Sequence, residues 1–111
     1  MKPLKPTLRE RNRYIAFEVV CDRKCSRDEV VRTVWNTATR FLGEIKTSEL
    51  SLWVMDWKDD KQKGILKVNH KSIRDIRVGV TMLDKIENSK ASINILGVSG
   101  TLKKARENYL R

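Results

Sequence analysis

Four short stretches of the chain consist largely of apolar residues and are bounded by polar or turn-forming ones, a pattern that predicts β-strands. The stretches are rich in β-branched and aromatic side chains, which favours strands further. They comprise residues 14–21, 50–57, 64–70 and 91–96. Ile15, Phe17, Val19 and Cys21 fall on one face of the first stretch, and we expect Cys21 in the core. The polar residues 58–63 predict a turn that joins the second and third strands into a hairpin.

Apolar residues recur every three to four positions in other stretches, which predicts amphipathic helices. Ser26 and Glu29 form a capping-box sequence at the start of the first helix, and Gly43 ends it. Its apolar stripe consists of Val30, Val31, Val34, Trp35, Ala38, Phe41 and Leu42. Ser72 is placed to cap a second helix, whose stripe consists of Ile73, Ile76, Val80 and Leu83. A last helix follows Thr101, and its apolar side consists of Leu102, Ala105 and Tyr109.

The order of these elements predicts the fold. Strand, helix, strand, strand, helix, strand is the split βαβ arrangement of ferredoxin-like and RRM-like α+β folds. In such folds both helices cover one face of a four-stranded antiparallel sheet, and here an extra C-terminal helix follows. We expect residues 13–111 to form this single domain and residues 1–12 to form a basic N-terminal arm.

The predicted strand 50–57 is apolar on both faces. Trp53, Met55 and Trp57 alternate with Leu52 and Val54, so strand parity places the first three on the face without helices. Monomers rarely expose large apolar patches. We expect both the C-terminal helix and a partner protein to cover this face, with Trp53, Met55 and Trp57 at the protein interface.

The charge of the chain indicates what kind of partner it binds. The chain has 24 Lys and Arg against 14 Asp and Glu, a net charge of +10 and a pI of about 10.0. This excess favours a polyanionic partner, and nucleic acid is preferred over an anionic membrane. Without an apolar stretch of about 20 residues or a secretory signal pattern, we expect a soluble cytoplasmic protein. Cys21 and Cys25 are expected to stay reduced, because two thiols and one distant histidine are too few ligands for a zinc site.

An RRM stacks bases on aromatic residues of its first and third strands. Lys63 and Gly64 begin the third-strand motif, but Ile65 and Lys67 stand where its aromatic residues belong, and only Tyr14 offers a ring on the first strand. Base stacking at these positions is therefore not expected, and the polar residues of the third strand suit phosphate and ribose contacts instead. The alternative is that they are ordinary solvated residues.

Candidate RNA-binding residues fall in three groups. In the arm they are Arg9, Arg11 and Arg13. Around the third strand they are Lys63, Lys67, Asn69, His70, Lys71 and Arg74. At the last helix they are Ser99, Gly100, Thr101, Lys103, Lys104 and Arg106. We expect Gly97 and Gly100 to turn the chain there, so that a helix N-terminus with three nearby cations binds a phosphate; the alternative is a plain helix cap with solvated lysines.

An enzyme is the hypothesis from a different class, because acylphosphatases share this architecture and size. Their anion cradle needs successive backbone amides between the first strand and the first helix, usually with glycine. The corresponding segment, Asp22 to Cys25, has no glycine and begins with an acid. His70 is the only histidine, and no serine forms an evident nucleophile and base pair with it. We therefore expect no catalytic residue and no metal ligand.

Four segments, in the right order, resemble one known family. They are Arg13 to Glu18, Leu50 to Val54, Lys63 to Ile65 with Asn69 to Lys71, and Leu96 to Ala105. The chain resembles the archaeal and eukaryal family of ribonuclease P protein component 2, an RRM-like subunit of the ribonucleoprotein that removes 5′ leaders from precursor tRNA. The likeness covers nearly the whole chain.

This resemblance implies that RNA with bound magnesium carries the cleavage chemistry. The protein would bind no cofactor itself, would support the catalytic half of the ribonuclease P RNA, and would pair with a TIM-barrel subunit among the other ribonuclease P proteins. Two alternatives stay open. One is a structured-RNA binder of another particle, such as a ribosomal or RNA-modification protein, and the other is a ferredoxin-like dimerisation module whose charge is incidental.

Overall fold

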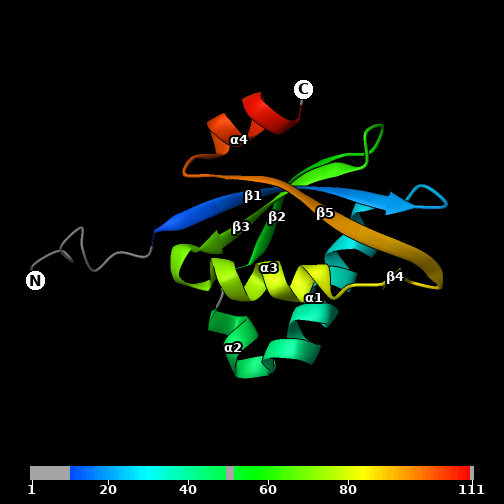
Figure 1. Cartoon of the computed structure of the whole chain (residues 1–111), viewed down its shortest axis with the longest axis horizontal. Helices are drawn as coiled ribbons and strands as arrows, with labels where there is room; N and C mark the ends of the chain where they lie inside the picture. Colours follow the sequence, from blue (N-terminus) through cyan, green and yellow to red (C-terminus); the bar gives the residue numbers. More distant parts are fainter. Residues whose placement is uncertain (1–10, 50–51, 111) are drawn as a thin grey trace, which may run out of the picture.

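The computed structural model describes residues 11–49 and 52–110, and Figure 1 shows a twisted sheet between two unequal helical layers. The described strands form one five-stranded sheet in the order β2-β3-β1-β5-β4, with antiparallel pairing throughout. The strands are β1 (Asn12–Cys21), β2 (Trp53–Lys58), β3 (Lys63–Asn69), β4 (Lys85–Ile86) and β5 (Ser89–Ser99). The predicted α+β class and the β2–β3 hairpin are confirmed, and the short β4 is an addition at the sheet edge.

Helices α1 (Arg27–Leu42) and α3 (Ile73–Thr81) cover one face of the sheet, whereas α4 (Leu102–Tyr109) lies on the opposite face (Figure 1). Ser26 and Glu29 form the predicted capping box on α1, and Gly43 ends that helix with a φ of 83°. Such a positive φ is easily adopted by glycine. The short helix α2 (Glu44–Glu49) follows directly. The 3₁₀ turn η2 (His70–Ser72) leads into α3.

The main core lies between the sheet and the layer of α1 and α3. Phe17 of β1 and Leu66 of β3 are buried there against Val34 of α1 and Ile76 of α3. Burying a side chain of this size stabilises the fold by about 1.5–3 kcal/mol. Val30 and Ala38 complete the buried side of α1, while Trp35 and Phe41 of the predicted stripe remain exposed.

A smaller apolar cluster lies on the other face of the sheet, under α4. It consists of Ile65, Ala105 and Leu110, with Tyr14 and Leu102 packed against it. The C-terminal helix therefore covers part of the face that the two main helices leave open, as predicted. Gly97 of β5 permits this docking, since a Cβ atom there would collide with the ring and hydroxyl of Tyr109.

Strand β2 departs from the predicted parity. Its register against β3 shifts between Val54 and Asp56, which leaves Met55 in a bulge. A bulge adds one residue to one strand and exchanges the faces of the side chains that follow. Trp57 therefore packs against the main core and stacks on Phe17, with ring centroids 6.1 Å apart. The prediction that Trp57 shares a face with Trp53 is wrong.

Three further local predictions are corrected. Ser72 makes no side-chain cap bond, because the chain enters α3 through η2. Gly97 does not turn the chain, because β5 continues through it to Ser99. Cys25 is the fully buried thiol, whereas Cys21 is only partly buried at the edge of the core. None of the described helices is long and apolar enough to cross a membrane.

Candidate nucleic-acid interface

The sheet register aligns one residue from each of four neighbouring strands. Trp53 of β2 pairs with Lys67 of β3, Lys67 pairs with Tyr14 of β1, and Tyr14 pairs with Ser99 of β5. We call these four residues the cross-strand row. Directly opposed side chains point to the same face with Cβ atoms about 4.5–5.5 Å apart. The row lies on the face that carries α4, because Tyr14 packs in the α4 cluster while the adjacent Ile15 and Leu66 pack in the main core.

Helix α4 begins at Leu102, three residues after Ser99 of the row. Thr101 caps it as predicted, with its side-chain oxygen accepting a hydrogen bond from the Lys104 backbone N–H at 3.2 Å. Lys103 and Lys104 are exposed on the first turn, and no carboxylate in the described part of the chain pairs with either. Their two charges and the positive end of the α4 dipole lie on the same side of the sheet as the row.

Arg106, the third predicted cation of α4, is committed to a different role. Its guanidinium forms a two-pronged ion pair with Asp56 of β2, in which Nη2 donates to Oδ1 at 3.0 Å. The hydrogen bond and the charge of Asp56 raise the pKa of Arg106. Because the Asp56 side chain is only 18% exposed, this pair ties α4 to the sheet edge.

The start of β1 meets the end of β3 at a second basic region. The His70 backbone N–H donates to the Arg11 carbonyl at 2.7 Å, and His70 Nδ1 lies 3.3 Å from the same oxygen. Arg11, Lys71 and Arg74 are exposed around this junction. Asn69 is buried, with only 8% of its surface exposed. The predicted contact between Asn69 and a ribose therefore does not fit this structure.

Not all predicted residues are brought together. Lys63 pairs with Glu18 and Lys58 at the hairpin end of β3. Four residues of strand separate it from Lys67, a distance of about 13 Å at the usual rise. Arg13 is half-buried and its Nη1 donates to the Asn12 carbonyl at 3.0 Å. Arg9 lies outside the described residues.

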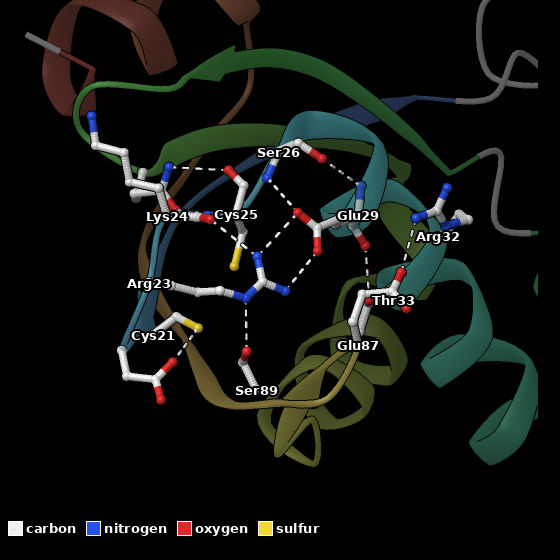
Figure 2. A network of polar contacts seen from close by, with 12 residues as sticks. Cys21, Arg23, Lys24, Cys25, Ser26, Glu29, Arg32, Thr33, Glu87 and Ser89 are labelled. Atoms are coloured by element: carbon white, nitrogen blue, oxygen red, sulfur yellow. Dashed lines mark hydrogen bonds and ion pairs between the residues drawn. The ribbon is translucent and has the colours of Figure 1, made fainter.

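A network of hydrogen bonds and ion pairs surrounds the segment between β1 and α1 (Figure 2). Arg23 forms a two-pronged ion pair with Glu29 at 3.2 and 2.6 Å and donates to Ser89 at 2.7 Å. The Ser26 amide donates to Glu29, and the Cys25 amide donates to Gln62 Oε1 at 2.8 Å. Two backbone amides of this segment, those of Cys25 and Ser26, thus donate to side-chain oxygens, which argues against an acylphosphatase-like anion cradle here.

The same network sets the ionisation of its members. Hydrogen bonds from Arg23 and from the Ser26 backbone lower the pKa of Glu29 to about 2, so this carboxylate stays charged and holds Arg23. Burial, followed by the hydrogen bond with Cys21, raises the pKa of Cys25 to about 11. A thiol with so high a pKa is a poor nucleophile at neutral pH. The described residues contain no cluster of three or more potential metal-ligating His, Cys, Asp or Glu side chains.

The sequence matches a family of known proteins. The model of the Rpp14/Pop5 family matches residues 13–110. The chain belongs to the Rpp14/Pop5 family. This match spans the predicted domain almost from end to end and includes the cross-strand row and α4.

Curated relatives of this Rpp14/Pop5 chain carry the name ribonuclease P protein component 2. The protein from Pyrococcus furiosus is 36% identical over 98% of this chain and 91% of its own length. The protein from Thermococcus kodakarensis is 38% identical over 98% and 91%, and that from Methanosarcina mazei is 35% identical over 100% and 94%. The resemblance read from the sequence is confirmed.

A solved structure shows the same fold. A chain in the cryo-EM structure of yeast ribonuclease MRP matches with a TM-score of 0.69 at 18% identity, over 88% of this chain and 79% of its own length. On this shared fold, the basic and aromatic residues considered above form two groups. One group is the row with Lys103 and Lys104, and the other surrounds the junction of Arg11 and His70.

Proposed function

We propose that this chain is an RNA-binding protein subunit of ribonuclease P. It supports the catalytic RNA while that RNA removes the 5′ leader from precursor tRNA. The observation that carries the proposal is the end-to-end match to ribonuclease P protein component 2 of Pyrococcus furiosus. The net charge of +10 supports it, because such a surface favours a polyanion.

The proposal divides the chemistry between protein and RNA. Magnesium acts through the RNA of the particle, and the protein supplies cations that replace some of the ions the folded RNA core needs. Its partners are the ribonuclease P RNA, precursor tRNA, a TIM-barrel subunit and the other ribonuclease P proteins, assembled in the cytoplasm. The exposed lysines of α4 support RNA contact on the α4 side of the sheet, and the junction at Arg11 offers a second basic region.

Recovery of the bound RNA tests this function. The full chain, tagged and expressed in the cells that make it, is purified at low salt, and the associated RNA is sequenced. We expect the ribonuclease P RNA to be enriched over ribosomal RNA, whereas an unrelated basic protein of equal net charge should enrich neither. Enrichment of ribosomal or modification-guide RNA instead would assign the chain to another particle, and recovery of no RNA would favour a dimerisation module.

A further inference from the structure

The edge of the sheet carries an aromatic ring that the fold leaves uncovered. Trp53, at the start of β2, is 63% exposed, against 36% for Trp35 and 43% for Phe41. Trp57, four residues later, is drawn into the core, so no packing requirement inside the described domain explains a tryptophan at position 53. The apolar cluster under α4 includes Tyr14 and Ile65 but not Trp53.

The residue beside this ring is a cation. Lys67 is directly opposed to Trp53 across the β2–β3 ladder, and Tyr14 is opposed to Lys67 on the next strand. Lys67 is half-buried, and the described residues provide it with no ion-pair partner. A lysine stem that packs along the sheet while its ammonium group reaches water is the usual arrangement for such a side chain.

The charges around the row favour one class of occupant. Asp56, the acidic residue of β2 on this face, is held by Arg106, and none of the ion pairs among the described residues involves Lys67 or the two α4 lysines. Protein interface cores are depleted of lysine, whereas single-stranded nucleic acid binds where aromatic platforms and cations alternate. The combination of an exposed indole and an adjacent ammonium group thus fits a nucleotide better than a protein surface.

We infer that Trp53 is a stacking platform for an unpaired base of the RNA, and that Lys67 contacts the phosphate next to that base. The inference rests on the proposed function and deepens it, because it names a contact for single-stranded RNA. It departs from the sequence-based expectation that Trp53 meets a protein partner. The platform lies on the second strand of the domain, outside the first- and third-strand positions where an RRM carries its aromatic residues.

Substitutions of Trp53 distinguish stacking of a base on the ring from simple apolar contact. Trp53→Phe keeps an aromatic ring, Trp53→Met keeps apolar bulk without a ring, and Trp53→Ala removes both. Trp35→Ala is the matched control, because Trp35 is also exposed but lies on α1, across the sheet. Each full-length variant is checked by circular dichroism and titrated with a single-stranded 12-nucleotide RNA, with the same sequence as a duplex, and with the ribonuclease P RNA.

Stacking predicts a defined pattern. Trp53→Ala and Trp53→Met should each weaken single-strand binding on the order of tenfold with the salt dependence unchanged, while Trp53→Phe stays within about threefold of the original chain. Lys67→Ala should instead reduce the slope of log affinity against log salt by about 0.7. Tryptophan fluorescence should be quenched by the oligonucleotide in the original chain but not in Trp53→Phe.

Equal single-strand affinity for Trp53→Met and the original chain would overturn the inference and leave the proposed function standing. Loss of TIM-barrel subunit binding in Trp53→Ala, with RNA affinity intact, would also overturn it, since the row would then be a protein surface. Failure of the original chain to bind ribonuclease P RNA would overturn the proposed function itself. Trp35→Ala is expected to leave all these affinities unchanged.

Discussion

Gly97 of β5 lies directly against Tyr109 of α4. The Tyr109 ring lies over Gly97 where a Cβ atom would be, although the two residues are on different elements. Any larger residue must push the ring, and with it the end of α4, away from the sheet. The packing of the α4 cluster on Tyr14 and Ile65 depends on this contact.

Gly97→Ala should therefore destabilise the protein by about 1–3 kcal/mol, the usual cost of overpacking. Urea unfolding followed by circular dichroism measures this cost. Gly100→Ala is the control, because a Cβ atom there meets open space. Adding Tyr109→Ala to Gly97→Ala should recover part of the loss, since the collision disappears. Equal stability of the Gly97→Ala and Gly100→Ala chains would contradict the packing described.

The sequence predicts the role of a residue when that role depends on residues a few positions away in the chain. Ser26, Glu29 and Thr101 act as the caps that their sequence neighbours predict. The role of Arg106 could not be predicted, because its partner Asp56 lies 50 residues away. The sequence predicts Asn69 on an open surface, but it is buried at the end of β3, where it pairs with Asn12 of β1.

At the scale of elements, α4 is held by an ion pair as well as by its apolar side. Arg106 and Asp56 should therefore be coupled. We expect Arg106→Ala and Asp56→Ala each to lower the urea midpoint slightly, and the double variant to lose less than the sum of the two. Lys103→Ala, on the exposed side of the same helix, serves as the control. Strict additivity of Arg106→Ala and Asp56→Ala would show that the pair contributes nothing to docking.

The first turn of α4 should carry part of the RNA affinity. Replacing Lys103 and Lys104 together by alanine spares Arg106 and leaves the buried Ala105 in place. If both lysines contact phosphates, the slope of log affinity against log salt should fall by about 1.4–1.8 for the ribonuclease P RNA. A matched double variant, Lys85→Ala with Lys90→Ala, removes two exposed lysines from the β4–β5 hairpin and should leave the slope unchanged. Equal slopes for both double variants would place the RNA elsewhere, for example at Arg11 and His70.

The predicted order of elements is right because each main element has its own periodic pattern and end signals. The short elements are not predictable in this way. Helix α2 has six residues, and its buried Thr47 is held by a hydrogen bond to the Gly43 carbonyl at the end of α1. The bulge at Met55 arises from the register between β2 and β3. For that reason simple alternation predicts the wrong face for Trp57 and does not show the cross-strand row.

At the scale of the whole molecule, the two faces of the sheet are covered by different elements. The layer of α1 and α3 is bound to the sheet through the main core, and α4 with the cross-strand row lies on the other side (Figure 1). Composition predicted a polyanionic partner, and the family resemblance named ribonuclease P. Neither could show which basic and aromatic residues share one face, because that depends on strand register and on the docking of α4.

Magnesium dependence of leader removal measures the central claim most directly. The ribonuclease P RNA is assembled with the TIM-barrel subunit, with and without this chain, and cleavage of precursor tRNA is followed as magnesium is varied. We predict that the full chain lowers the magnesium concentration needed for half-maximal cleavage, that an unrelated basic protein of equal charge does not, and that the chain alone cleaves nothing. An unchanged magnesium requirement, or cleavage by the protein without RNA, would contradict the account.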